Sequence, residues 1–153
     1  MESALAIRQS LIGTWSLGEY VAVRKDNGEN FHPLGLGLQG SLLYTADDSV
    51  SVHFMQPGMA EHVDTNPANA TLNAQNGSMR HYLAYCGTFH VDEGVNQSQI
   101  THQIALCNIP DWVGQSQRRI ARLSGNQLEL STPEPVLLDV SHILCSYLIP
   151  QTH

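Results

Sequence analysis

A histidine falls on an apolar strand face in the stretch QSQITHQIALCNIPDWVG, residues 97–114. Read with a period of two, one face of this predicted strand holds a mostly apolar set: Ser98, Ile100, His102, Ile104 and Leu106. A buried imidazole must be hydrogen-bonded, or it costs about 1–3 kcal/mol of stability. Since the ordinary pKa of histidine lies near neutrality, His102 is also the first candidate for a general acid or base.

The later run QRRIARL offers a cation for the same interior. Its two possible inward phases are Gln117, Arg119, Ala121 and Leu123, or Arg118, Ile120 and Arg122. We prefer the first phase because it places one arginine inside and not two. Arg119 and Gln117 could then hold an anion, an enolate or a carbonyl oxygen next to His102.

Two tyrosines are candidates to orient a substrate or donate a proton. In HYLAYCGTFHV the more apolar phase contains Tyr85, and in GSLLYT the apolar phase pairs Leu42 with Tyr44. Tyrosines at such positions are also common as core aromatics with a satisfied hydroxyl. In SVSVHFM, an inward Phe54 leaves His53 facing solvent.

The elements that must position these side chains are mostly strands. Residues 2–12 predict a short helix, with Ser3 as a cap. Strand-like runs follow at 14–24, 40–45, 49–55, 81–91, 98–107, 117–124, 127–132 and 141–149. The segment 56–80, rich in Pro, Asn, Gly and Ala, is interpreted as a long loop that could form a lid.

About eight strands without alternating helices predict one all-β domain over residues 1–153, an antiparallel up-and-down barrel with a short N-terminal helix. The interior of such a barrel has room for about one small ligand. The expected ligand contacts include Gln117 and five apolar or aromatic residues: Leu42, Phe54, Ile100, Ile104 and Trp112.

Composition excludes several classes of partner and site. The net charge of -7, from 7 Lys and Arg against 14 Asp and Glu, argues against nucleic acid and anionic membranes. Three cysteines without a CxxC spacing, and the lack of a signal-like start, favour a cytoplasmic protein. No HxH or HExxH spacing and no nucleotide-binding loop occurs, so we expect neither a metal nor a cofactor.

Several motifs spread over most of the chain occur together in one known family. Gly13-Thr14-Trp15 matches the GxW signature on the first strand of calycins. Further matching positions, within about residues 11–133, are Tyr44, Thr45, Asp47, Met55, Pro57, Tyr82, Tyr85, Gly87, Thr101, His102, Pro110, Trp112, Gly114, Gln117 and Arg119. With these motifs the chain resembles the bacterial and fungal lipocalin-like domain family. The resemblance implies a lipocalin-type barrel with a central cavity, whose floor is closed by Trp15 behind an N-terminal helical segment.

The chain departs from this family at two places. Asp48 stands where the family usually has a glycine in the tight turn. The family also tends to end with an aromatic-arginine pair whose arginine covers the floor tryptophan, and SYLIP at 146–150 contains no arginine. The second departure leaves open how the floor is closed and which register the last strand adopts.

Two functions from different classes fit these residues. The leading hypothesis is a cofactor-independent isomerase, cyclase or dehydratase of secondary metabolism that acts on a hydrophobic polyketide- or terpenoid-like molecule. In that enzyme His102 moves the proton, Arg119 and Gln117 hold the oxyanion, and Tyr44 or Tyr85 orients or donates. The alternative is a carrier that binds an apolar small molecule without changing it. Either function is compatible with a homodimer.

Overall fold

The computed structural model describes residues 3–24, 27–32, 37–56, 82–93, 98–132 and 140–148. At Arg24, Glu93, Leu148 and 140–146 it describes the backbone alone. The described elements are α1 (Ala4–Leu11), β1 (Gly13–Arg24), β2 (Asn30–Phe31), β3 (Gln39–Tyr44), β4 (Ser49–Met55), β5 (Tyr82–Glu93), β6 (Ser98–Cys107), the 3-10 helix η2 (Pro110–Trp112), β7 (Ser116–Ser124), β8 (Gln127–Ser131) and β9 (Val140–Leu148).

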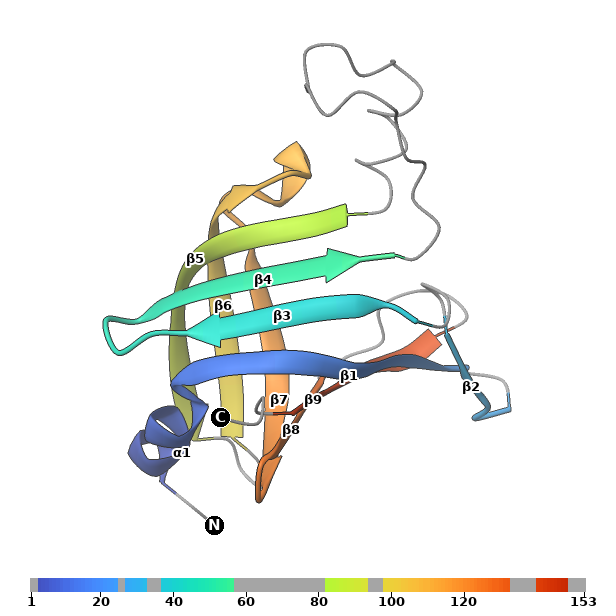
Figure 1. Cartoon of the computed structure of the whole chain (residues 1–153), viewed down its shortest axis with the longest axis horizontal. Coiled ribbons are helices and arrows are strands. Elements are labelled where there is room, and N and C mark those ends of the chain that lie inside the picture. The colour runs from blue at the N-terminus through green and yellow to red at the C-terminus, as the bar shows by residue number, and fades with distance from the viewer. Residues whose placement is uncertain are drawn as a thin grey trace.

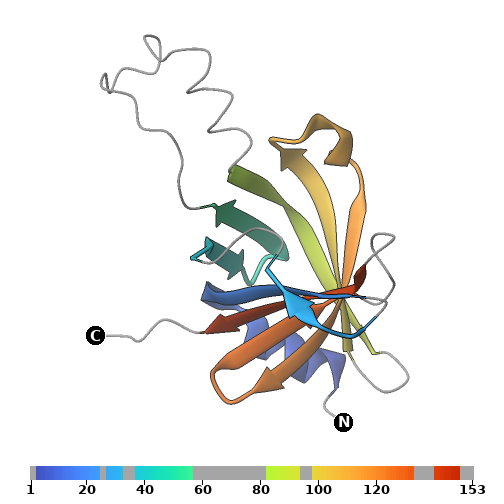
Figure 2. The same cartoon turned by 90° about the vertical axis from the view of Figure 1, so that its right-hand side faces the viewer.

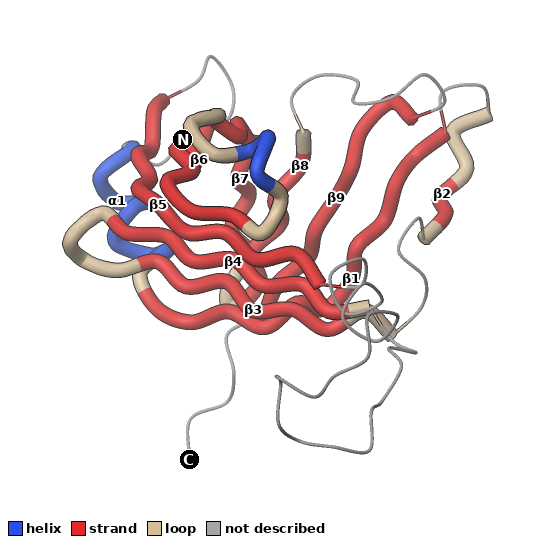
Figure 3. The backbone as a smooth tube through the Cα atoms, turned by 90° about the horizontal axis from the view of Figure 1, so that it is seen from above, coloured by secondary structure: helices blue, strands red, loops and turns tan. Residues whose placement is uncertain are grey.

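The strands pair antiparallel in chain order and the pairing closes on itself. Within the described residues, nine strands form one sheet in the order β2-β1-β3-β4-β5-β6-β7-β8-β9. The first part of β1 pairs with β3, and its second part pairs with β9 (Figure 1). β2 attaches to β1 alone, so the other eight strands surround a common interior (Figures 2 and 3). The predicted all-β, lipocalin-like architecture is confirmed.

The N-terminal helix closes one end of this interior. The Ser3 hydroxyl caps α1 by accepting from the Ala6 amide at 3.1 Å, as the sequence predicts. Leu11 and Trp15 are almost fully buried, and the Trp15 indole N–H donates to the Leu11 carbonyl at 2.8 Å. The helix and the floor tryptophan therefore form one packed unit.

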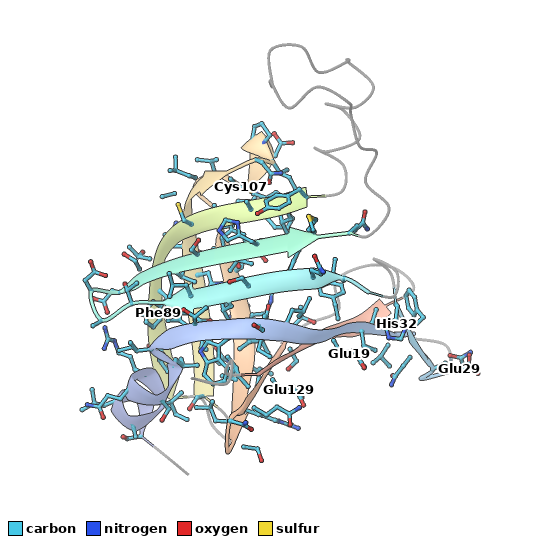
Figure 4. The ribbon with its side chains drawn as sticks, in the orientation of Figure 1. Glu19, Glu29, His32, Phe89, Cys107 and Glu129 are labelled. Atoms are coloured by element: carbon cyan, nitrogen blue, oxygen red, sulfur yellow. The ribbon has the colours of Figure 1, made fainter. Side chains whose placement is uncertain are left out.

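An arginine from α1 also lies at this end of the barrel. The Arg8 guanidinium lies 5.6 Å from the centroid of the Phe89 ring, which Figure 4 labels near α1. It donates to the Ala46 carbonyl at 2.9 Å and to the Asp48 carboxylate at 2.5 Å. A cation from the helix therefore contacts this end, while the C-terminal SYLIP segment contains none.

The β3–β4 turn explains the aspartate found in place of glycine. Asp48 has a φ of +70°, the only positive value at a non-glycine position among the described residues. The left-handed region is unfavourable for most side chains, but aspartate tolerates it better than alanine does. The ion pair with Arg8 is the contact that a glycine at this position could not make.

Replacing Asp48 with Gly should change the free energy of unfolding by less than about 1 kcal/mol. The loss of an exposed ion pair is offset because glycine adopts positive φ without strain. Replacing Asp48 with Ala should cost about 2 kcal/mol, since the pair is lost and the backbone strain remains. Urea unfolding of the three proteins measures both; equal stability of the two variants would contradict this account.

The predicted inward phases are confirmed on most strands. Along β4, the buried residues alternate as Val50, Val52 and Phe54, with His53 on the other face. The inward residues predicted on the other strands are also buried, namely Leu42, Tyr44, Tyr85, Ile100, His102, Ile104 and Ala121, and Leu128 and Leu130 of β8 are buried too. The 56–80 segment predicted as a lid lies almost wholly outside the described residues.

The prediction that Leu106 faces inward is wrong. Leu106 is 67% exposed, although it shares the period-two phase of Ile104. Gly87 on β5 pairs with Ile104 while Cys86 pairs with Leu106, so β6 carries one extra residue at Ala105. This β-bulge reverses the faces beyond it. Cys107 consequently packs against the core in place of Leu106.

Candidate functional site

His102 lies at the centre of a buried hydrogen-bonded chain. Its Nε2 lies 2.6 Å from the Tyr44 hydroxyl, and its Nδ1 lies 2.7 Å from the Tyr85 hydroxyl. The three residues come from β3, β5 and β6, and Tyr44 and His102 are 0% and 2% exposed. Both ring nitrogens therefore have a partner, as a buried imidazole requires.

The protonation state of His102 follows from this burial. Burial, with a smaller contribution from the positive charge of Arg119, lowers the pKa of His102 to about 3. The imidazole is therefore neutral near pH 7, with one N–H and one bare nitrogen. One tyrosine hydroxyl must donate to the bare nitrogen, and the other must accept from the N–H. Such a histidine fixes two hydroxyl groups but is a weak proton acceptor at neutral pH.

A cavity of about 60 Å³ adjoins this chain inside the barrel. Its apolar lining consists of Val52, Phe54, Leu83, Trp112 and Leu130. Its polar lining consists of Tyr20, Tyr85, His102, Arg119 and Tyr147. The cavity as described has room for a few water molecules, whereas pockets for drug-sized ligands measure about 300–1,000 Å³. A larger ligand therefore requires lining side chains to move.

Arg119 brings a positive charge to this cavity. β7 pairs with β6 so that Arg119 lies opposite Ile100 and Gln117 lies opposite His102. The Arg119 Nη2 donates to Gln117 Oε1 at 3.2 Å, and Nη1 donates to the Arg118 carbonyl at 2.7 Å. Both acceptors are neutral oxygens. Within the described residues, Arg119 forms no ion pair with a carboxylate.

Trp112 lines the cavity from the η2 loop, residues 108–115, which connects β6 to β7 and contains η2. Its ring centroid is 6.5 Å from that of Tyr85, and its side chain is half-buried. The loop is held by backbone hydrogen bonds, in which Ile104 N donates to the Gln115 carbonyl and Gly114 N donates to the Ile104 carbonyl, both at 2.9 Å. Trp112 is therefore attached to the same strand that carries His102.

The predicted site residues divide into three groups. His102, Arg119, Tyr85, Trp112 and Phe54 line the cavity. Four others do not line it, although they were expected at the ligand or catalytic site: Tyr44 and Leu42 pack at 0% exposure, and Ile100 and Ile104 at 0% and 1%. Gln117 reaches the site through its hydrogen bond to Arg119. The location of these side chains does not test whether any of them has a catalytic role.

Sequence reasoning missed two tyrosines that line the cavity, Tyr20 and Tyr147. A register shift between Leu17 and Glu19 changes the phase of β1, so that Trp15 faces inward before it and Tyr20 after it. Gly18 inside an otherwise strand-like run was an available signal, because such glycines often mark bulges. To place Tyr147 in the cavity from the sequence would require the pairing register of β9, which no local sequence pattern specifies.

A second, larger hollow of about 370 Å³ lies on the outer face of β4, β5 and β6. Its lining includes Ser51, His53 and Cys86, which belong to the outward phases of these strands. The His53 ring bridges two hydroxyls, that of Ser51 at 3.0 Å and that of Tyr82 at 2.9 Å. Tyr85 lines both this hollow and the cavity beside His102, whereas His102 and Arg119 do not line the hollow.

The described residues hold no group of three or more His, Cys, Asp or Glu side chains placed to bind a metal ion. In the same part of the chain, no helix has both the length and the apolar character needed to cross a membrane.

Two comparisons bear on the chain as a whole. A family model described as the lipocalin-like domain matches residues 12–140, which begin next to β1 and end at the first residue of β9. A protein of Aspergillus oryzae named 4'-hydroxy-3'-methoxypropiophenone carrier protein is 32% identical over 93 residues. That alignment covers 58% of this chain and 84% of the relative.

Proposed function

The chain belongs to the lipocalin-like domain family, and we propose that it is a carrier which binds a small aromatic molecule inside the barrel without changing it. The observation that supports this most directly is the state of His102. Its two ring nitrogens are occupied by tyrosine hydroxyls, and its pKa of about 3 leaves it neutral. The imidazole therefore acts as a fixed polar wall of the binding site.

The lining supports an aromatic ligand that carries oxygen functions. Phe54, Tyr85 and Trp112 supply ring faces and edges for an aromatic ring. Tyrosine hydroxyls and Arg119 supply hydrogen-bond partners for its oxygens. The name of the Aspergillus oryzae relative describes a hydroxylated aryl ketone as cargo, and we propose the same class of ligand for this chain.

Entry of such a ligand requires a side chain that lines the cavity to move. The cavity of about 60 Å³ is smaller than an aryl ketone, so at least one lining side chain must yield. Trp112 belongs to a three-residue 3-10 helix and is half-buried, whereas Phe54 and Leu130 belong to paired strands. We propose that the η2 loop opens and that Trp112 then stacks against the bound ring.

Titration with 4'-hydroxy-3'-methoxypropiophenone should quench tryptophan fluorescence with a dissociation constant on the order of 10 μM. Trp112→Phe should remove most of the signal, because the remaining Trp15 is 1% exposed and packs against α1 at the closed end. Calorimetry measures binding in the variant independently of fluorescence. No saturable binding by the unmodified protein, up to the solubility limit of the ketone, would reject the carrier function.

The cofactor-independent enzyme remains the alternative, because Arg119 and His102 line one cavity. The low pKa of His102 weakens it as a general base at neutral pH. Mass spectrometry and chromatography of the ligand after incubation separate the two functions. Recovery of the unchanged ketone supports the carrier; a new isomer or a loss of water supports the enzyme.

A further inference from the structure

The charge of the cavity is unbalanced. Arg119 is the only ionised side chain among its described lining residues, since His102 is neutral. The other titratable lining groups are the phenols of Tyr20 on β1, Tyr85 on β5 and Tyr147 on β9. β4, β8 and η2 contribute apolar side chains to the lining. No described carboxylate therefore faces the guanidinium across the cavity.

The guanidinium is also held in one orientation before any ligand arrives. Its hydrogen bonds to Gln117 Oε1 and to the Arg118 carbonyl direct it without neutralising its charge. An arginine presents five N–H donors in a planar fork, and these two bonds use only part of that capacity. A charge-assisted hydrogen bond to an anion in a partly buried site is about twice as strong as one between neutral groups.

We propose that this cavity binds its ligand as an anion, with an ionised phenolic oxygen of the ligand on the Arg119 guanidinium. This inference rests on the proposed carrier function and on its ligand class. In a 4'-hydroxyaryl ketone the carbonyl accepts negative charge through the ring, so the phenol is already acidic. On binding, the phenol O–H bond breaks, its electron pair stays on oxygen, and the proton leaves to water.

His102 does not retain that proton, because its pKa is about 3. Burial by itself would favour the neutral phenol, since desolvation penalises the charged form. The proposal therefore requires the attraction of Arg119 to exceed that penalty. The attraction of a single cation can exceed this penalty where the rest of the cavity wall is neutral and no carboxylate competes with the ligand for the cation.

The test uses 4'-hydroxypropiophenone, whose phenol and phenolate have different absorption spectra, and 4'-methoxypropiophenone, which cannot ionise. At the pH where half of the free hydroxy ketone is ionised, the bound ketone should show the phenolate spectrum. A shift of one pKa unit corresponds to tenfold tighter binding of the phenolate than of the phenol, and we expect at least that. The methoxy ketone should bind about tenfold more weakly or worse.

Arg119→Met should abolish the shift, because it keeps an apolar stem and removes the charge. Arg119→Lys should retain part of it, since a point charge replaces the fork. Arg122→Met is the matched control: Arg122 lies on the same strand, is exposed and does not line the cavity, so the shift should persist. Near-ultraviolet circular dichroism checks that each variant is folded.

The outcomes separate this inference from the carrier function. If the hydroxy ketone binds the unmodified protein as the phenol, or if both ketones bind equally well, the anion site is rejected and the carrier function stands. A phenolate spectrum that persists in folded Arg119→Met also rejects it. If neither ketone binds, the proposed carrier function itself fails.

Discussion

Replacing His102 with Ala is expected to lower the free energy of unfolding by about 3 kcal/mol at pH 7. The change removes one hydrogen-bond partner from each of two tyrosine hydroxyls, at Tyr44 and Tyr85, and leaves a space in a packed interior. A broken buried hydrogen-bond network and a new cavity are two of the established causes of large destabilisation. Urea unfolding followed by circular dichroism measures the change.

His90→Ala is the matched control for this substitution. His90 lies on β5, and its side chain is 62% exposed, so its loss should change the free energy of unfolding by less than about 0.5 kcal/mol. If the His102 and His90 variants proved equally stable, the buried chain of Tyr44, His102 and Tyr85 would not contribute to stability as the distances indicate.

The same histidine should make stability depend on pH. The folded pKa of about 3 lies below the ordinary histidine pKa of 6.5, so between these values the unfolded chain binds a proton that the native state excludes. The stability linked to the neutral state of His102 is therefore fully present above about pH 6.5. It is lost as the pH falls towards 3, by at most about 1.4 kcal/mol per pH unit. His102→Gln should flatten this dependence, whereas His90→Gln should leave it in place.

Gly87→Ala is expected to destabilise the protein by about 3 kcal/mol or more, or to prevent folding. A Cβ at this position would lie 1.8 Å from the Gln103 carbonyl oxygen and 2.9 Å from the Ala105 amide nitrogen. These are backbone atoms of the facing strand, so no side-chain rotation relieves the overlap. The bulge between β5 and β6 must instead open, which breaks the hydrogen bonds on either side.

Thr88→Ala is the control, because Thr88 is the next residue along β5 and its side chain is exposed. It should cost less than about 0.5 kcal/mol. Thermal unfolding of the two variants and of the unmodified protein compares them directly. A Gly87→Ala protein within about 1 kcal/mol of the unmodified protein would show that the bulge adapts to a side chain.

Much of the fold could be predicted because strand alternation is a local property. In β6, the apolar neighbours Ile100 and Ile104 were sufficient to place His102 inside. In β7, the preference for one inward arginine over two placed Arg119 correctly. The prediction for Leu106 was wrong because a bulge shifts the period by one residue, and the bulge depends on the facing strand.

The ligand-contact residues were harder to predict than the inward faces. Leu42, Ile100 and Ile104 face inward as expected, yet they pack in the core and do not line the cavity. A strand pattern distinguishes inside from outside, but it does not show where the interior is filled and where it is open. That depends on the summed volumes of side chains from all strands.

The sequence by itself determined the class of fold, the helix cap at Ser3 and the inward positions of His102 and Arg119, since each follows from neighbours along the chain. The tertiary structure alone decided that His102 meets Tyr44, 58 residues away, and Tyr85, 17 residues away. Those contacts depend on the register between strands. They give both ring nitrogens of the candidate base a partner, while burial keeps the imidazole neutral. Arg119 is then the ionised side chain, among the described residues that line the cavity, that a ligand would meet.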